Sequence, residues 1–206
     1  MKICHIFAGG ELGSVEHSWF TSHKGLVICA DCGLRHAEKI GLKPDILVGD
    51  FDSYVGKLPH VKEVYRSVPE KDDTDTLMAV KIAIERGYDH IFLYGALGGP
   101  RFDHAFANIQ TMIYANEHGA DLILVGNELV YLQGEGKKSY PRTDGERYFS
   151  VFAITENVNI KSLSGVKYPL LDYEMKRSFP IGVSNEITEE EAQLIINSGL
   201  ALVIQS

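Results

Sequence analysis

Cysteine is scarce in this chain, in which Cys4, Cys29 and Cys32 are the only three. An odd number of thiols does not make a disulfide framework, and such frameworks belong to small secreted chains rather than to one with an ordinary core. Cys29 and Cys32 form a C-x-x-C pair, but no second cysteine pair supplies the further ligands of a structural zinc site. We therefore expect the fold to depend on its core, with a redox role for this pair as the less favoured interpretation.

Basic residues and long apolar runs are also in short supply. The 20 Lys and Arg are outnumbered by 28 Asp and Glu, which gives a net charge of −8 at pH 7. This balance does not support nucleic-acid binding, because phosphate backbones attract basic surfaces. No apolar run reaches the length that spans a bilayer, and residues 1–5 lack the pattern of a signal peptide. These absences predict a cytoplasmic protein with no nucleic-acid or membrane partner.

The chain does contain enough apolar sequence for a sizeable core, since 45% of its 206 residues are hydrophobic. Through its first two thirds, a helix that ends in glycine is followed by a short polar loop and an apolar strand. The expected helices cover residues 34–40, 77–86 and 105–118. The expected strands include residues 26–30, 45–48, 90–94 and 121–125. Continuous apolar strands of this kind are typical of a parallel sheet covered by helices.

The pattern changes after about residue 127, where short strand-like segments follow one another. They cover residues 128–133, 148–154, 158–161, 179–183 and 201–204, while residues 189–196 resemble a short helix. We predict two domains. Residues 1–127 would form a three-layer α/β domain with an open, mostly parallel sheet, and residues 128–206 an all-β sandwich.

Residues 49–53 (GDFDS) carry two carboxylates directly after an apolar strand. Alternation along an extended segment places Asp50 and Asp52 on one side, with the hydroxyl of Ser53 next to them. Asp-x-Asp is a weak motif alone, so a solvated loop with an Asx turn is the alternative to a metal site.

A second acidic cluster comprises Asp72, Asp73 and Asp75, which follow Lys71 and precede an expected helix. A helix start explains part of it, because Thr74 or Asp73 would cap the helix and acids favour the positive end of its dipole. A helix start accounts for one or two of these acids but not for the third, so ligand binding is the competing interpretation.

A glycine-rich segment (GGPRFDH, residues 98–104) lies between a buried strand and an expected helix. Its glycines would let the backbone approach a phosphate closely, and the helix start offers free N–H groups. Arg101 is suited to forked contacts with phosphate oxygens. Asp103 would be a first-turn capping acid or a metal ligand, and His104 a general base or a hydrogen-bonded helix residue. No Gly-Lys-Ser/Thr follows, so this is not a Walker loop.

Several of these acidic segments follow apolar strands, as does Asp31 within residues 30–33. Carboxylates at the carboxyl ends of neighbouring parallel strands meet in one crevice and repel one another unless a cation lies between them. The sequence therefore predicts a Mg²⁺ site that handles the phosphates of a nucleotide.

In this order, the motifs resemble those of the thiamine pyrophosphokinase family over nearly the whole chain. They occupy residues 30–33, 44–53, 71–75, 98–104, 163–170 and 182–186. Two departures from the family pattern are Cys32, which replaces a glycine, and Pro100 in the glycine-rich segment. Neither departure removes a carboxylate.

This resemblance implies an α/β catalytic domain followed by a β sandwich that helps to bind thiamine, in a homodimer with active sites at the subunit interface. The implied reaction transfers the diphosphate of ATP to the hydroxyl of thiamine and yields thiamine diphosphate and AMP. Positioning and charge neutralisation would dominate its catalysis, as in other phosphoryl transfers.

The resemblance also implies roles for single residues. Mg²⁺ would be held by Asp50, Asp52 and Asp75, which together with Arg101 and Asp103 are the expected catalytic residues. ATP and its phosphates would contact Asp31, Gly33, Lys71, Thr74, Gly98, Gly99, Arg101 and His104. Thiamine would contact Tyr168, Ser184 and Asn185. Without the family resemblance, the plainer interpretation is that Tyr168 is a core tyrosine and Ser184 a turn serine.

Two other functions compete with this one. A haloacid-dehalogenase-like phosphatase would use Asp50 as its nucleophile and Asp52 as its acid/base, but it leaves the glycine-rich segment and the β-rich tail unexplained. The other alternative is a non-catalytic module that binds a nucleotide or thiamine and has kept only the binding pocket. The full set of acids argues against such a loss of catalysis.

Overall fold

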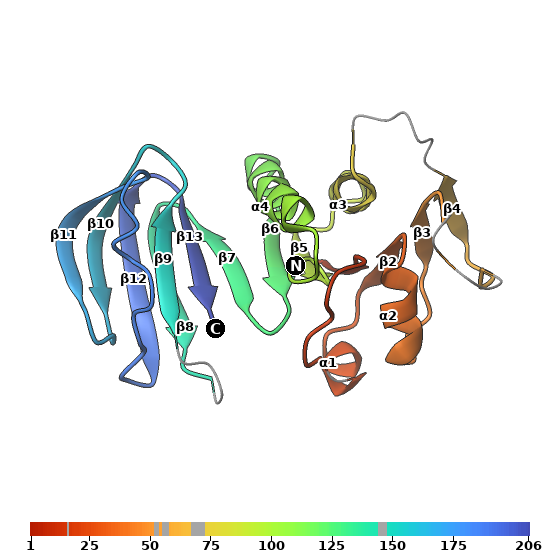
Figure 1. Ribbon diagram of the computed structural model, residues 1–206, viewed down its shortest axis with the longest axis horizontal. Helices are drawn as coiled ribbons and strands as arrows, with labels where there is room; N and C mark the ends of the chain where they lie inside the picture. Colours follow the sequence, from red (N-terminus) through yellow and green to blue (C-terminus); the bar gives the residue numbers. More distant parts are fainter. Residues whose placement is uncertain (16, 52–53, 55–57, 67–72, 144–147) are drawn as a thin grey trace. The chain divides into compact units, whose positions relative to one another are not determined.

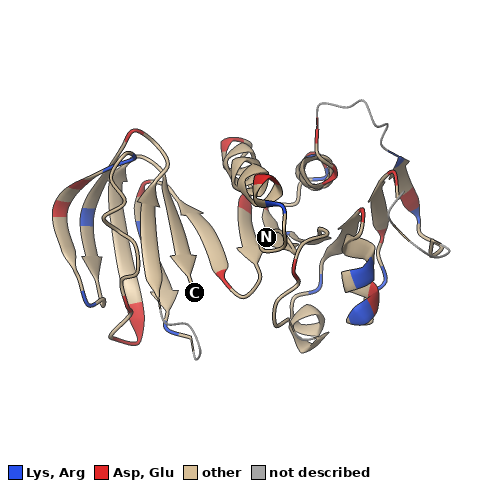
Figure 2. Ribbon diagram, viewed as in Figure 1, with Lys and Arg blue, Asp and Glu red and all other residues tan. Residues whose placement is uncertain are grey.

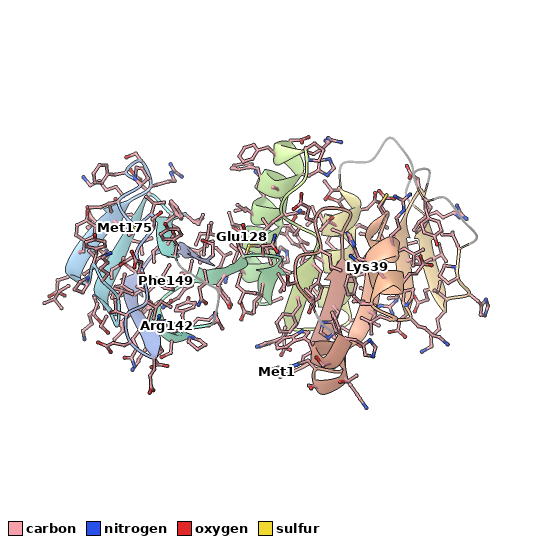
Figure 3. The ribbon with its side chains drawn as sticks, turned by 60° about the horizontal axis from the view of Figure 1, so that its bottom comes forward. Met1, Lys39, Glu128, Arg142, Phe149 and Met175 are labelled. Carbon is pink, nitrogen blue, oxygen red and sulfur yellow. The ribbon has the colours of Figure 1, made fainter. Side chains whose placement is uncertain are left out.

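The computed structural model describes residues 1–15, 17–51, 54, 58–66, 73–143 and 148–206 (Figure 1). These residues form two compact units, Met1–Asn127 and Glu128–Ser206. Figure 3 adds the side chains and labels Glu128, the first residue of the second unit. Lys and Arg lie scattered among Asp and Glu along the described ribbon (Figure 2). None of the helices in this part of the chain has the length and apolar character needed to cross a bilayer.

Six parallel strands form the sheet of the first unit. They are β1 (Ile3–Phe7), β2 (Leu26–Ala30), β3 (Ile46–Gly49), β4 (Glu63–Arg66), β5 (His90–Tyr94) and β6 (Asp121–Val125). Their order is β4-β3-β2-β1-β5-β6, and each neighbouring pair is parallel. The predicted parallel sheet is thus present, and it includes β4, which the sequence did not indicate.

The strand order places a topological switch between β1 and β5. From β1 the chain adds β2, β3 and β4 on one side, and then adds β5 and β6 on the other. In the register of the sheet, Phe7 at the end of β1 lies opposite Cys29 of β2 and Tyr94 of β5. Open α/β sheets bind ligands at such a point, because the loops that leave the two strands diverge there.

Helices lie on both faces of this sheet in Figure 1. They are α1 (His17–Ser22), α2 (Gly33–Lys39), α3 (Asp75–Glu85) and α4 (Phe102–Glu117). Thr74 caps α3, because its Oγ1 atom accepts a hydrogen bond from the Leu77 N–H at 3.1 Å. This contact decides between the two caps that the sequence allowed and starts the helix two residues earlier than predicted.

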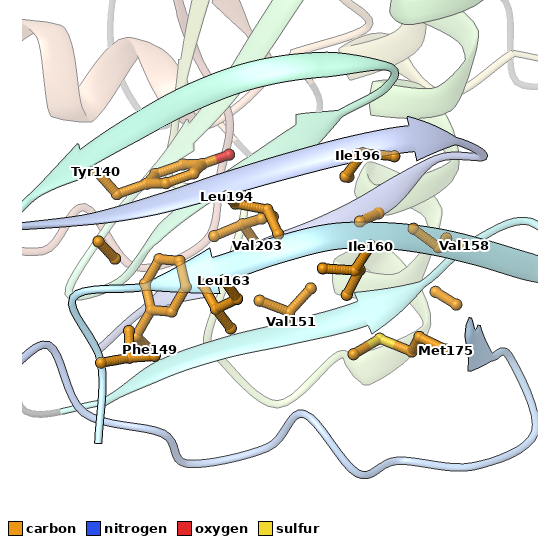
Figure 4. Close-up of a cluster of buried hydrophobic side chains, with 14 residues drawn as sticks. Tyr140, Phe149, Val151, Val158, Ile160, Leu163, Met175, Leu194, Ile196 and Val203 are labelled. Atoms are coloured by element: carbon orange, nitrogen blue, oxygen red, sulfur yellow. The ribbon is translucent and has the colours of Figure 1, made fainter. Parts of the chain in front are cut away.

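In its described residues, the second unit contains strands and loops but no helix. Its strands are β7 (Leu129–Gln133), β8 (Gly136–Pro141), β9 (Phe149–Ala153), β10 (Asn157–Ser164), β11 (Leu170–Lys176), β12 (Glu191–Ser198) and β13 (Ala201–Gln205). They form the antiparallel ladders β7-β13-β9 and β11-β10-β12-β8. Both ladders contribute to one core, for example Val151 and Val203 from the first and Ile160 and Leu194 from the second (Figure 4). The protein is therefore a mixed α/β chain with a mostly parallel sheet and a separate antiparallel one.

The helix predicted over residues 189–196 is wrong, because this segment forms strand β12 between β10 and β8. Its Glu-rich start favours a helix, but the burial alternates residue by residue, with Ala192, Leu194 and Ile196 facing the core. Two neighbouring strands thus override a weak local propensity.

The strand predicted over residues 179–183 is also wrong. Its backbone groups bond locally, from the Phe179 N–H to the Lys176 carbonyl at 3.0 Å and from the Ile181 N–H to the Phe179 carbonyl at 2.9 Å. The strand of this region is β11, which the sequence did not indicate.

Gly33 provides a test of how closely α2 packs on β1. A Cβ atom on Gly33 would lie 1.9 Å from the carbonyl oxygen of Phe7. Although alanine is the better helix former by about 1 kcal/mol, we expect Gly33→Ala to lower the free energy of unfolding by about 2–4 kcal/mol in denaturant titrations. Gly41→Ala is the control: Gly41 has a φ of +74° and open space around it, so the cost should be only about 1 kcal/mol. Equal losses in the two variants would contradict the packing argument.

Candidate active site

A cavity of about 610 Å³ lies where the sheet order of the first unit switches. Residues from four chain segments line it: residues 8–11 after β1, 30–32 at the end of β2, 74–76 at the start of α3, and nine residues between 95 and 108 after β5. Three of the four segments leave the carboxyl ends of parallel strands. The cavity therefore occupies the position at which α/β sheets bind ligands.

Asp31 brings a carboxylate to this cavity, in surroundings that disfavour its ionised form. Its backbone is in the left-handed region, with a φ of +49°, and its N–H donates to the Val48 carbonyl at 2.9 Å. Burial, together with repulsion by Asp75, a hydrogen bond with Asp75 and repulsion by Asp50, raises the pKa of Asp31 from 3.8 to about 6. Three acids far apart in the sequence therefore interact here.

The acid groups fit a hard cation. The Oδ1 atom of Asp31 is buried without a hydrogen-bond partner among the described residues, and carboxylate oxygen is the ligand that Mg²⁺ prefers. Within the same residues, no group of three or more His, Cys, Asp or Glu is arranged to hold a metal ion. Asp52 lies outside the described residues, so the expected trio of Asp50, Asp52 and Asp75 is only partly in view.

The glycine-rich segment lines the same cavity as Asp31. Gly98 and Gly99 have φ angles of +73° and +78°, a backbone shape that favours glycine. Asn108 in α4 tethers the start of the loop that carries the segment, because its Nδ2 atom donates to the Ala96 carbonyl at 2.7 Å. Arg101 donates from Nη2 to Oδ2 of Asp103 at 2.6 Å, and this pair lowers the pKa of Asp103 to about 2.

The structure gathers many of the predicted nucleotide residues around this cavity. Those that line it are Asp31, Thr74, Asp75, Gly98, Gly99, Arg101 and His104. Asp50 interacts with Asp31, and Asp103 with Arg101, although neither lines the cavity. Gly33 instead begins α2 and is buried against the backbone at the end of β1. Lys71 lies outside the described residues.

Sequence reasoning missed the segment after β1. Gly9, Gly10 and Glu11 line the cavity, as does Asn108. A signal was available, because a pair of glycines directly follows an apolar strand there, as in the segment after β5. It was overlooked because no carboxylate pair accompanies it.

A second cavity, of about 350 Å³, lies in the second unit and is mostly apolar. It is lined by Val151, Leu163, Tyr168, Leu170, Met175, Ile181, Gly182, Val183 and Asn185. Two of the three predicted thiamine residues, Tyr168 and Asn185, are thus in its wall. Ser184 directly precedes Asn185 in a turn, with a φ of +57°, and its N–H donates to Oγ of Ser150 at 2.9 Å.

Tyr168 and Asn185 differ in what their side chains can offer a ligand. Tyr168 is 62% exposed, whereas Asn185 is 7% exposed. The Asn185 amide accepts from the Tyr168 N–H at 3.0 Å and donates to the Tyr168 carbonyl at 2.9 Å. Asn185 therefore fixes the backbone that carries the exposed tyrosine ring.

The raised pKa of Asp31 predicts how the metal-free protein responds to pH. The folded state holds this proton more tightly than the unfolded state, so the ionised carboxylate costs stability as the pH rises from about 4 through about 6. Without metal and nucleotide, Asp31→Asn should raise the melting temperature at pH 8, and the gain should vanish near pH 4. The control is Asp172→Asn, at an exposed site in the second unit where asparagine tolerates the φ of +45°. An Asp31→Asn gain that is the same at both pH values would refute the electrostatic cause.

Comparison with known proteins agrees with this geometry. Two family models match the chain: thiamin pyrophosphokinase, catalytic domain, over residues 17–124, and thiamin pyrophosphokinase, vitamin B1 binding domain, over residues 139–201. The thiamine pyrophosphokinase of Bacillus subtilis (strain 168) is 27% identical over 223 residues, which cover 100% of this chain and 99% of that protein.

Solved structures give the same result. The thiamine pyrophosphokinase from Bacillus subtilis has a TM-score of 0.88 at 26% identity, covering 100% of this chain and 99% of its own. A thiamin pyrophosphokinase family protein from Enterococcus faecalis has a TM-score of 0.85 at 26% identity, with the same coverage. The resemblance drawn from the motifs is confirmed: the chain belongs to the thiamine pyrophosphokinase family.

Proposed function

We propose that this protein is a thiamine pyrophosphokinase that transfers the diphosphate of ATP to the primary hydroxyl of thiamine and releases AMP. The observation that carries the proposal is the cavity at the β1–β5 switch, where interacting carboxylates face a glycine-rich segment with an arginine. In a chain of this family, that arrangement suits a triphosphate with its cation. The phosphatase and the non-catalytic module are not favoured.

The glycine-rich segment would bind the phosphates of ATP. Gly98 and Gly99 present backbone N–H groups without side chains in the way, and Arg101 adds a forked cation. Arg101 would exchange its bonds with Asp103 for bonds to phosphate oxygens. Thr74 and His104, which line the same cavity, would contact the nucleotide, with Lys71 as a further contact.

Asp50, Asp52 and Asp75, with Asp31 beside them, would hold Mg²⁺. When bound, the ion supplies charge neutralisation for the transferred phosphates. The chain's own contribution is to position the reactants: it orients the triphosphate against the glycine-rich segment and lets a carboxylate such as Asp75 or Asp103 accept the hydroxyl proton of thiamine.

The second unit would supply the thiamine pocket. Tyr168 would stack on the pyrimidine ring with its exposed face, Ser184 would lie beside thiamine, and Asn185 would position both. We further propose that residues 1–127 are a three-layer catalytic domain and residues 128–206 a thiamine-binding β sandwich.

Assembly and location remain proposals as well. The protein would act as a homodimer with its active sites at the subunit interface. Large apolar side chains stay exposed in the second unit, among them Leu171, Phe179 and Val183, which supports a partner surface there. The cytoplasmic location expected from the sequence stays a prediction.

The products of the reaction test the proposed function directly. Incubation with thiamine, ATP and Mg²⁺ should give AMP and thiamine diphosphate in a one-to-one ratio by chromatography. ADP together with thiamine monophosphate would instead show that a single phosphate is transferred.

The metal site is tested separately. EDTA should stop the reaction and added Mg²⁺ should restore it. Asp50→Asn should lower turnover by about two orders of magnitude with an unchanged circular dichroism spectrum.

Tyr168 tests the thiamine pocket. Because stacking on a cationic aromatic ligand contributes about 0.5–2 kcal/mol, Tyr168→Ala should raise the thiamine KM several-fold and leave the ATP KM nearly unchanged. Equal rises in both constants would indicate a packing defect. If the site is shared between subunits, mixing Tyr168→Ala with Asp50→Asn should restore part of the activity through hybrid dimers. No recovery, once subunit exchange is verified, would mean that each site is built by one chain.

A further inference from the structure

The carboxylate of Glu11 lies on the glycine-rich segment. Its Oε1 atom accepts a hydrogen bond from the Gly99 N–H at 3.2 Å, across 88 residues of sequence. The Glu11 backbone is held separately, because its N–H donates to the Leu97 carbonyl at 3.1 Å and the Gly10 N–H donates to the Gly95 carbonyl at 2.8 Å. A fixed backbone therefore presents this carboxylate to Gly99.

The geometry of the glycine turn admits an anion at this point. A Cβ atom on Gly98 would lie 3.0 Å from Oε2 of Glu11, so a larger residue would crowd the carboxylate. Apart from the two chain neighbours of Gly99, no described residue has a heavy atom within 4 Å of the place where a Cβ of Gly99 would be. A backbone N–H in such a turn accepts carboxylate and phosphate oxygens alike. Glu11 thus accepts from the Gly99 N–H, a donor that would also suit a phosphate oxygen.

Arg101, the other strong donor of the segment, is engaged in the same way. Asp103 accepts from it twice, from Nε to Oδ1 at 3.2 Å and from Nη2 to Oδ2 at 2.6 Å. Both donors therefore hold a carboxylate of the chain itself. Asp103 belongs to the segment, whereas Glu11 reaches it from the loop after β1.

We propose that Glu11 is a placeholder for a phosphate oxygen of ATP, which holds the Gly98–Gly99 turn in shape before the nucleotide arrives and yields the Gly99 N–H when it binds. This rests on the proposed function, because it requires the phosphates of ATP at this segment. The hydrogen bond preorganises the turn, while the negative charge competes with the triphosphate and repels it. Glu11 is thus a positioning residue that tunes nucleotide affinity and touches no reacting atom.

Glu11→Gln separates these two effects, because the amide oxygen still accepts from Gly99 but carries no charge. Calorimetric titration with ATP and Mg²⁺, in the absence of thiamine, should give a Kd about three- to tenfold lower than that of the wild type. The gain should shrink at high ionic strength, since salt screens the repulsion. Glu11→Ala loses both effects, so it should bind ATP less tightly than Glu11→Gln. The thiamine KM should stay unchanged in both variants.

Glu117→Gln is the matched control, because it removes the same charge at the far end of α4. That end lies about 20 Å from the glycine-rich segment, beyond the screening length, so the ATP Kd should not change. A Kd for Glu11→Gln that is unchanged or raised would overturn the placeholder, and a raised value would show that Glu11 itself binds the metal–nucleotide complex. A wild-type protein that binds no ATP would overturn this proposal and the proposed function together. A tighter Glu11→Gln variant in a protein that forms no thiamine diphosphate would overturn the proposed function alone.

Discussion

The candidate site depends on the close approach of backbone segments at the carboxyl ends of β1 and β5. The Ala8 N–H donates to the Tyr94 carbonyl and the Gly10 N–H to the Gly95 carbonyl, both at 2.8 Å. A Cβ on Gly95 would lie 2.4 Å from the Ala8 oxygen, and one on Gly10 would lie 2.6 Å from the Gly95 oxygen. Only glycine permits this contact, and it is the contact that brings the loop after β1 and the glycine-rich segment to the same cavity.

A hydrogen-bond network of His5, Tyr94 and Trp19 also connects the same two strands. The Nε2 atom of His5 in β1 lies 2.6 Å from the His23 carbonyl, so this nitrogen carries the proton and donates it. The Tyr94 hydroxyl of β5 then donates to the other ring nitrogen at 3.1 Å and accepts from the Trp19 indole at 3.0 Å. Burial lowers the pKa of His5, which keeps the ring neutral and the network satisfied. The network links α1 to both strands on which the cavity depends.

The charged and polar groups of the site favour a ligand that carries both a cation and an anion. Acids at the ends of β2 and β3 and at the start of α3 repel one another; burial and this repulsion raise the pKa of Asp31, and a cation would relieve both. The hydrogen-bond donors of the glycine-rich segment, which lines the same cavity, favour an anion, and carboxylates of the chain itself accept from some of these donors. A metal-bound triphosphate satisfies both preferences at once, because it carries the cation and the anion in one ligand.

The sequence by itself determined the features that depend on neighbouring residues: the glycine-ended helices, the continuous apolar strands and the ordered motifs that identify the family. Tertiary structure alone decided which distant residues meet. It paired Asp31 with Asp75 and Glu11 with Gly99, placed Gly33 in the packing of α2, and made residues 191–198 a strand despite their helical composition. The physical reason is that such contacts follow from strand order and pairing partners, which couple segments far apart in the chain and leave no periodic signal in either segment alone.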